Sequence, residues 1–296
     1  MEYAFYPGCL FQTEQYGCHL STRETLGRLG LELKNIDKSS CCGYISYRLS
    51  SPVTWTFLTA RNMALAEIMG LEILTVCNEC HISFLQVKKQ LAEDPLLRSK
   101  IDDALKLEDL EYHNECEINH IVEVLYDKIG VKRISESIVK PLDRFKFTTQ
   151  PGCHLFRPKE LSMPDGVEPY KLDELVRVLG AEIVDYPEKL DCCGALIVAD
   201  DESTRKVANR KLRSIKERRI DGVVTICPHC FKMLDTSQGD IKNLSGGKTR
   251  VPVIHYTQLL GLAMGINAVK LGLQFNQSPV EIIYRARVGG KNTFVS

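Results

Sequence analysis

Ten of the twelve cysteines in this sequence form two sets of five with nearly the same spacing. In each set a lone cysteine is followed by an adjacent Cys-Cys-Gly and then by a Cys-x-x-Cys pair. Thiolates at such spacings bind soft metal ions, above all iron–sulfur clusters and zinc. A tetrahedral zinc ion or an ordinary four-iron cluster needs only four thiolates, so sets of five indicate an unusual centre. The candidate ligands are Cys9, Cys41, Cys42, Cys77 and Cys80 in the first set, and Cys153, Cys192, Cys193, Cys227 and Cys230 in the second.

Other chemistries compete for these cysteines, and each leaves part of the pattern unexplained. A structural zinc site usually has two Cys-x-x-Cys pairs, whereas each set contains one. Residues Cys77 to His81 match the c-type haem attachment pattern, but the second set has Phe231 where the histidine should stand. A thioredoxin-like redox pair would use two cysteines and leave three in each set without a role. A disulfide framework is typical of small secreted chains, and this chain has 296 residues.

The cysteine sets belong to a longer internal repeat, which indicates duplication and fusion. A repeat of this length predicts two domains rather than a solenoid. We place the boundary after residue 140, so that residues 1–140 form an N-terminal domain and residues 141–296 a C-terminal domain with a tail. The matching segments outside the Cys-Cys-Gly turns are residues 6–9 with 150–153, 29–33 with 179–183, and 73–77 with 223–227.

Strands and helices alternate in each copy, and this order predicts the fold class. We expect two tandem homologous α/β domains, each with a parallel or mixed sheet flanked by helices. The cysteines follow predicted strands, where open α/β sheets bind their ligands, so the five thiols of a copy should meet at one sheet edge. The recurring elements are strands at Tyr3–Tyr6 and Phe145–Thr149, helices at Leu58–Met69 and Thr204–Arg219, and buried strands at Ile73–Val76 and Val223–Ile226.

Composition excludes several classes of protein. The 38 basic and 38 acidic residues balance, which argues against a nucleic-acid binder with a basic surface. Apolar runs are too short for a membrane span, so we expect no direct insertion into a membrane. The first residues lack the basic start and apolar stretch of a signal peptide, and we therefore expect a cytoplasmic protein whose thiols stay reduced.

The doubled pattern of a lone cysteine, Cys-Cys-Gly and Cys-x-x-Cys resembles that of the cysteine-rich CCG domain family. Over residues 1–265 the chain is similar to the B subunits of heterodisulfide reductases from methanogenic archaea. This resemblance implies two noncubane [4Fe–4S] clusters, one held by each set of five cysteines. It implies an oxidoreductase that reduces the disulfide of coenzyme M and coenzyme B to two thiols. Two clusters suit this reaction, because a disulfide takes up two electrons and clusters usually deliver one each.

The resemblance also implies partners and leaves rival functions open. An iron–sulfur C subunit and a flavin-bearing A subunit would supply electrons, together with a hydrogenase or formate dehydrogenase module, and the substrate would be a small-molecule disulfide. Other members of the family serve in lactate, glycolate or fumarate metabolism. The alternative is therefore an electron-transfer subunit of a flavin-dependent organic-acid oxidoreductase, and a structural zinc module is a third hypothesis.

His154 is the candidate proton donor, because two thiolate products need protons and a histidine can supply one near neutral pH. It follows Cys153 directly, whereas the first copy has Leu10 at the equivalent position. His81 and His229 are weaker candidates, and hydrogen bonding beside the cluster is the role we expect for them.

The remaining candidates have structural interpretations. His113 and His255 form an expected repeated pair with hydrogen-bonding roles. Cys18 and Cys116 lie outside both sets and are predicted to be small buried residues. A weaker hypothesis assigns Arg157, Lys159 and Lys171 to the attraction of an anionic substrate, against the alternative that they are solvated surface charges.

Overall fold

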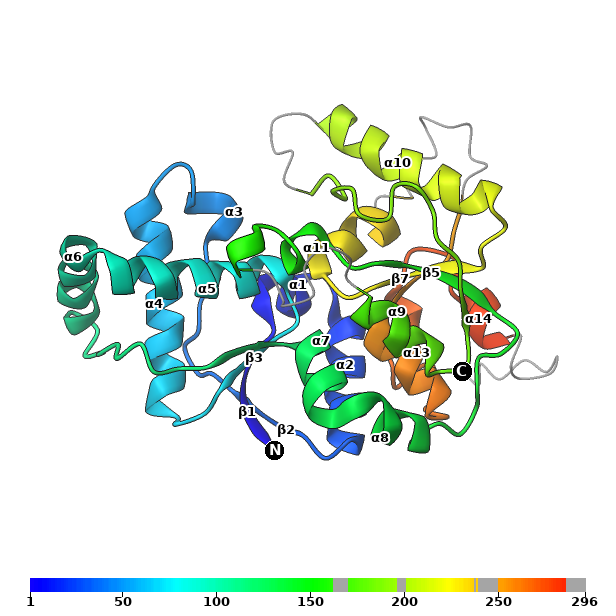
Figure 1. The fold of residues 1–296 in the computed structure, drawn as a ribbon, viewed down its shortest axis with the longest axis horizontal. Coiled ribbons are helices and arrows are strands. Elements are labelled where there is room, and N and C mark those ends of the chain that lie inside the picture. Colours follow the sequence, from blue (N-terminus) through cyan, green and yellow to red (C-terminus); the bar gives the residue numbers. More distant parts are fainter. Residues whose placement is uncertain (162–169, 196–200, 237, 239–249, 286–296) are drawn as a thin grey trace. The chain divides into compact units, whose positions relative to one another are not determined.

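The computed structural model describes residues 1–161, 170–195, 201–236, 238 and 250–285, which contain two four-stranded sheets (Figure 1). The chain divides into two compact units, and each unit holds one sheet. Unit 1 comprises Met1–Glu14, Leu26–Gly130 and Cys153–Lys171, and unit 2 comprises Gln15–Thr25, Val131–Gly152 and Leu172–Ser296, as far as these ranges are described. The predicted domain boundary after residue 140 stays a prediction.

The sheet of unit 1 is entirely parallel and has the order β2-β1-β3-β4. From β1 the chain passes to β2 on one side and then returns to β3 on the other side. The connections therefore diverge between β1 and β3, which is the topological switch point where open α/β sheets bind ligands. The strands are β1 (Glu2–Tyr6), β2 (Glu32–Asn35), β3 (Ile73–Thr75) and β4 (Ile118–His120).

The sheet of unit 2 repeats this topology with the order β6-β5-β7-β8, again with parallel neighbours. Its switch point lies between β5 and β7. Thr148 pairs with Val223 in this sheet as Ala4 pairs with Ile73 in the first, so register as well as order is shared. The strands are β5 (Lys146–Gln150), β6 (Glu182–Ile183), β7 (Gly222–Thr225) and β8 (Val253–His255).

Helices connect the strands, as parallel neighbours require. In unit 1, the fourth α-helix packs against both the fifth and the sixth (Figure 1). The described α-helices are α1 (Gly8–Thr13), α2 (Tyr16–Arg28), α3 (Tyr44–Tyr47), α4 (Pro52–Ile68), α5 (Asn78–Glu93), α6 (Pro95–Lys106), α7 (Ile121–Glu123), α8 (Val131–Glu136), α9 (Lys171–Arg177), α10 (Asp201–Glu217), α11 (Pro228–Phe231), α13 (Tyr256–Ala263) and α14 (Glu281–Arg285). Among the described residues, none of these helices combines the length and apolar character needed to cross a membrane.

The predicted α/β class with two repeated units and cysteines near strand ends is confirmed, and both sheets are parallel rather than mixed. The predicted helix at Leu58–Met69 is α4, which begins earlier, at Pro52. Proline suits the first turn of a helix, because the N–H that it lacks has no partner there. Strands β4 and β8 were not predicted. They are three residues long and, unlike β3, are not part of a continuous apolar run that ends at a cysteine motif.

The expected histidine pair His113 and His255 is wrong, because the structural counterpart of His255 is His120. His120 ends β4 and His255 ends β8, and each caps the helix that follows its strand. The ring Nδ1 of His120 accepts the N–H of Val122 at 3.3 Å, and that of His255 accepts the N–H of Thr257 at 3.4 Å. His113, by contrast, has a side chain that is 59% exposed.

Burial lowers the pKa of His255 to about 4. In the neutral ring Nδ1 accepts from Thr257, and Nε2 lies 3.0 Å from the carbonyl oxygen of Ile226, to which it can donate. Protonation would place a hydrogen on Nδ1 as well, so that this atom could no longer accept the N–H of Thr257 and cap α13.

We expect His255 to make the protein acid-sensitive. The unfolded histidine binds a proton near pH 6.5 and the folded one near pH 4, so acidification over this interval should remove up to about 3 kcal/mol of stability. The contribution is complete above pH 6.5 and is lost as the pH falls. Denaturant unfolding at pH 7 and pH 4 should show a weaker pH dependence for His255→Asn than for the unsubstituted protein. His113→Asn is the matched control, and equal pH dependence in all three proteins would contradict the assignment.

Candidate metal centres

The five cysteines of the first set all follow carboxyl ends of strands in unit 1. Cys9 lies in α1 just past β1, and Cys41 and Cys42 lie past β2. Cys77 is the N-cap of α5, and Cys80 lies in the first turn of that helix, just past β3. Because β1 and β3 flank the switch point, parallel topology brings the three segments to one edge of the sheet.

The thiols of the first set lie close together. Sγ of Cys42 is 3.5 Å from Sγ of Cys80, and both side chains are buried. A hydrogen bond with Cys41 raises the pKa of Cys9, and burial and the neighbouring thiols raise it further. The pKa of Cys42 is raised by its hydrogen bond with Cys41, and that of Cys80 by its hydrogen bonds with Cys42 and Cys77. These thiols can all ionise together only beside a compensating positive charge, which bound metal ions provide.

Gly8 brings the backbone against these thiols. Its φ is +73°, and a Cβ added there would lie 3.2 Å from Sγ of Cys80 and 3.6 Å from Cβ of Cys77. An L side chain at this position would be strained in the backbone and crowded by two candidate ligands. The absence of a side chain therefore keeps space around the thiols, as a bulky cluster requires. Gly152 has a φ of +83° at the equivalent position.

A buried polar network fixes the Cys-Cys-Gly turn of unit 1. The indole Nε1 of Trp55 donates to Oγ of Ser83 at 2.7 Å. Oγ of Ser83 lies 3.0 Å from Oγ1 of Thr59, which donates to the carbonyl oxygen of Cys42 at 3.0 Å. Helices α4 and α5 thus hold the backbone that carries two of the thiols, so the ligand geometry is built into the packing of these helices.

The second site repeats this arrangement in unit 2. Cys192 and Cys193 follow β6, Cys227 is the N-cap of α11, and Cys230 lies within that helix. The pKa of Cys193 is raised by its hydrogen bond with Cys192, and that of Cys230 by its hydrogen bonds with Cys193 and Cys227. Four candidate ligands therefore meet within unit 2.

Cys153 belongs to a segment that is grouped with unit 1. It begins a short 3₁₀ helix three residues past β5 in the chain, the position that corresponds to Cys9 after β1. Its role as the fifth ligand of the second site, like the other individual ligand assignments, stays a prediction.

His154 contacts two side chains of unit 1 that the sequence did not single out. Its Nδ1 lies 3.5 Å from Oε1 of Glu79, and its Nε2 lies 3.3 Å from the hydroxyl oxygen of Tyr44. Glu79 stands inside the first Cys-x-x-Cys, and Tyr44 directly follows the first Cys-Cys-Gly. The positions of Glu79 and Tyr44 within the cysteine motifs are the sequence feature by which these two residues could have been identified. The His154 side chain is 14% exposed, which places it near solvent but mostly within the protein.

The weaker candidates have different surroundings. His81 is buried and its pKa is lowered to about 4 by burial, which fits a structural role better than proton donation at neutral pH. His229 is partly exposed.

The hypothesis that Lys171 attracts substrate is wrong for this structure, because its Nζ is paired with Asp127 at 2.8 Å and the residue is buried. Arg157 and Lys159 are exposed, as solvated surface charges would be.

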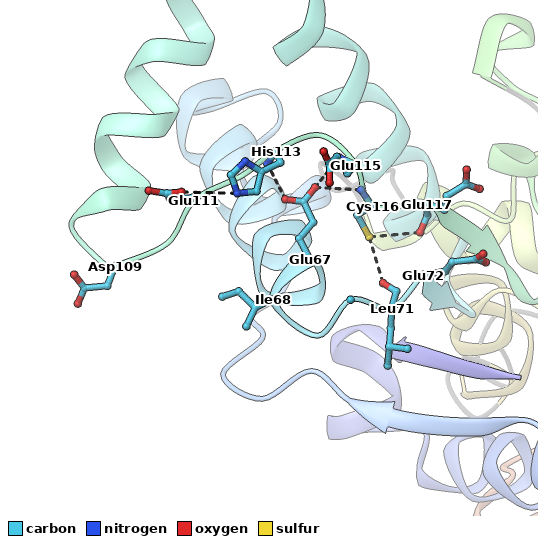
Figure 2. A pocket seen from close by; sticks show the side chains of 11 residues that line it. Glu67, Ile68, Leu71, Glu72, Asp109, Glu111, His113, Glu115, Cys116 and Glu117 are labelled. Atoms are coloured by element: carbon cyan, nitrogen blue, oxygen red, sulfur yellow. Dashed lines mark hydrogen bonds and ion pairs between the residues drawn. The ribbon is translucent and has the colours of Figure 1, made fainter.

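A cavity of about 570 Å³ in unit 1 contains none of the ten candidate ligands (Figure 2). It is lined by carboxylates and by Cys116, whose Sγ lies 3.5 Å from the carbonyl oxygen of Glu117. Figure 2 shows the carboxylate of Glu67, which accepts the backbone N–H groups of His113, Glu115 and Cys116 at 2.7, 2.8 and 3.1 Å. Cys116 and Cys18 are both buried, which confirms their predicted character.

Comparison with known proteins defines the class to which this fold and these sites belong. Residues 3–85 and 147–235 match the family model of the cysteine-rich domain known as CCG, and the chain belongs to this family. All ten candidate ligands fall within the two matched ranges, five in each.

Particular relatives are subunits of oxidoreductases. The chain is 33% identical to the B subunit of the ferredoxin/F420H2-dependent CoB–CoM heterodisulfide reductase of Methanosarcina acetivorans, over 92% of each chain. It is also 33% identical to the 8-methylmenaquinol:fumarate reductase membrane anchor subunit of Wolinella succinogenes, over 93% of this chain and 96% of that one. Sequence identity alone therefore does not distinguish a subunit of a heterodisulfide reductase from a subunit of a fumarate reductase.

A solved structure shares the fold. A hypothetical protein from Helicobacter pylori matches with a TM-score of 0.77 at 15% identity, over 94% of this chain and 52% of that chain. This chain thus spans about half the length of that protein, and at such low identity the likeness concerns the fold alone.

We expect Gly8→Ala to impair the first site selectively. Left-handed backbone with a Cβ costs about 1–2 kcal/mol, and the added methyl would crowd the thiols of Cys80 and Cys77. Iron bound per chain after anaerobic reconstitution should fall toward half, with a lower free energy of unfolding. Gly27→Ala is the matched control, because a Cβ there would meet nothing within 4 Å. Full iron content and unchanged stability in Gly8→Ala would contradict this account.

Proposed function

We propose that this chain is a catalytic iron–sulfur subunit that reduces the CoB–CoM heterodisulfide to two thiols. The observation that carries the proposal is the convergence of five thiols at the carboxyl edge of the first sheet and of four thiols of the second set in unit 2. Support for the substrate comes from two relatives that are B subunits of CoB–CoM heterodisulfide reductases, which are 33% and 34% identical over 92% and 91% of this chain.

The proposed cofactors are two noncubane [4Fe–4S] clusters, one for each set of five cysteines. The close thiols, their raised pKa values and the space beside Gly8 fit a bulky, positively charged iron–sulfur core. When bound, such clusters supply one-electron transfer. Reduction of a disulfide consumes two electrons and two protons and breaks one S–S bond, so the chain's own residues must help to deliver protons.

His154 is the proposed proton donor. Its ring lies between the carboxylate of Glu79 and the hydroxyl of Tyr44, so a proton lost from the ring could be replaced through either neighbour. The carboxylate of Glu79 would also attract the ring whenever the ring is protonated, because Nδ1 lies 3.5 Å from Oε1.

The alternative proposal is an electron-transfer subunit of a fumarate-reducing enzyme. The observation that favours it is the relative from Wolinella succinogenes, whose identity and coverage are as high as those of the heterodisulfide reductase subunits. In that role the clusters would relay electrons and the isolated chain would not reduce a disulfide.

The proposed partners follow from the heterodisulfide reductase assignment. An iron–sulfur C subunit and a flavin-bearing A subunit would deliver electrons, linked in turn to a hydrogenase or formate dehydrogenase module. The relatives are themselves subunits of larger reductases, which supports a role within an assembly.

Metal analysis followed by a disulfide-reduction assay tests the proposed function. We expect about eight iron and eight acid-labile sulfides per chain after anaerobic reconstitution, as two four-iron clusters require. With reduced viologen as electron donor, the isolated protein should oxidise viologen when the CoB–CoM heterodisulfide is added. Full iron content without disulfide reduction would favour the electron-transfer role, and zinc in place of iron would refute both proposals.

Replacement of His154 tests the proposed proton donor. A positioned general acid typically contributes about 10²–10⁴-fold, so His154→Asn should lower turnover by at least about 100-fold while iron content stays unchanged. Tyr44→Phe should have a smaller effect, because Glu79 still contacts the ring. His113→Asn is the control, because this histidine is exposed and lies outside both cysteine sets. Unchanged turnover in His154→Asn would remove this residue from the mechanism.

A further inference from the structure

A lysine is completely buried beside the cysteines of the second site. Lys211 lies on α10, six residues before the end of that helix, and its exposed fraction is 0%. Lysine is almost never fully buried unless its charge has a partner, because the ammonium loses its hydration. Its position inside unit 2 therefore needs a compensating interaction.

Several groups of unit 2 surround the ammonium of Lys211. Nζ donates a hydrogen bond to the carbonyl oxygen of Glu188 and lies 5.7 Å from the centroid of the Tyr186 ring. Tyr186 in turn donates to Oε1 of Gln150 at 2.8 Å, at the carboxyl end of β5. A neutral acceptor and an aromatic ring thus contact the cation.

The cysteines and one carboxylate lie close enough to Lys211 to act on its charge. Burial lowers the pKa of Lys211, and the negative charges of Cys230, Asp191, Cys193 and Cys192 oppose this lowering when those groups are ionised. Asp191 also attracts Lys211, but its carboxylate lies 2.5 Å from Arg210, which reaches Glu188 at 3.9 Å as well. Arg210 thus offsets part of the acidic charge near Lys211, whereas the groups that act most strongly on the ammonium in the described part of the chain include the cysteines and no second cation.

The first site has a neutral residue at the corresponding place. Asn62 lies six residues before the end of α4 and is also completely buried. Its amide bonds the turn before Cys41, accepting the N–H of Ser40 at 2.9 Å and donating to the carbonyl oxygen of Ser40 at 3.0 Å. Both residues therefore bind the backbone that leads into a Cys-Cys-Gly turn, but only Lys211 adds a charge.

We propose that Lys211 sets the redox properties of the second site by placing a fixed positive charge beside its thiolates, raising the reduction potential of the cluster held there. This inference rests on the proposed function, because it requires iron–sulfur clusters in both sites. Reduction adds one electron to the cluster, and a nearby cation stabilises the added negative charge. An electron that enters the chain is therefore held more tightly at the second site than it would be without the lysine.

An anaerobic redox titration followed by electron paramagnetic resonance tests the proposal on the full, reconstituted chain. In Lys211→Met, which keeps the length of the side chain without its charge, one midpoint potential should shift to a more negative value and the other should stay unchanged. Lys211→Arg should keep both potentials near their original values. Lys206→Met is the matched control, because it removes a charge from an exposed position on the same helix and should shift neither potential.

Each outcome supports or overturns the role of Lys211. Unchanged potentials in Lys211→Met, with full iron and sulfide, would overturn the proposal while leaving the proposed function intact. Iron lost from Lys211→Met but kept by Lys211→Arg would support it, because charge and not packing would then be what the site requires. Iron lost from both variants would assign Lys211 to packing and overturn the proposal. Zinc instead of iron in the unsubstituted protein would be a failure of the proposed function itself.

Discussion

Repulsion among clustered thiolates is the constraint on which both sites depend. Parallel strands bring cysteines from three separate segments to one sheet edge, and each thiol makes ionisation of its neighbours harder. Such a site is stable with ionised ligands only when positive charge lies among them. In the first site, Gly8 has no side chain that would occupy the space beside the thiols. The hydrogen bonds among Trp55, Ser83 and Thr59 fix the turn that carries Cys42.

Much of this arrangement was predictable from sequence, because it follows from periodic patterns and chain order. The repeated spacing indicated two equivalent units, and the strand–helix alternation placed the cysteines at carboxyl ends of parallel strands. Side-chain partners were less predictable. Glu79 and Tyr44 meet His154 across large sequence separations, and Lys171 is paired with Asp127, which no local pattern reveals. Strands β4 and β8 were missed for a different reason, since neither short strand leads into a cysteine motif that would have drawn attention to it.

The two copies share their backbone plan more closely than their polar interiors. In the first sheet, Tyr6 ends β1 and donates its hydroxyl to the carbonyl oxygen of Ser40 at 2.6 Å. In the second, Gln150 stands at that position and a tyrosine, Tyr186, comes from the loop after β6 to meet it. Duplication thus preserved topology and thiol positions, while the residues that hydrogen-bond around the thiols were exchanged. Because these polar residues differ, we expect the two cysteine sites to differ in their electrostatic surroundings although their backbones are similar.

Unit 1 is built from three separate segments of the chain, and this has a consequence for folding during synthesis. Its segment Cys153–Lys171 is synthesised after the whole first half of the chain, yet Tyr170 packs edge-on against Tyr126 and Lys171 pairs with Asp127. All five cysteines of the first set leave the ribosome before these partners do. Unit 1 can therefore complete its packing only after residues 153–171 have been synthesised. If residues 1–140 and 141–296 were translated separately, the first would lack Cys153–Lys171 of unit 1 and the second would lack Gln15–Thr25 of unit 2.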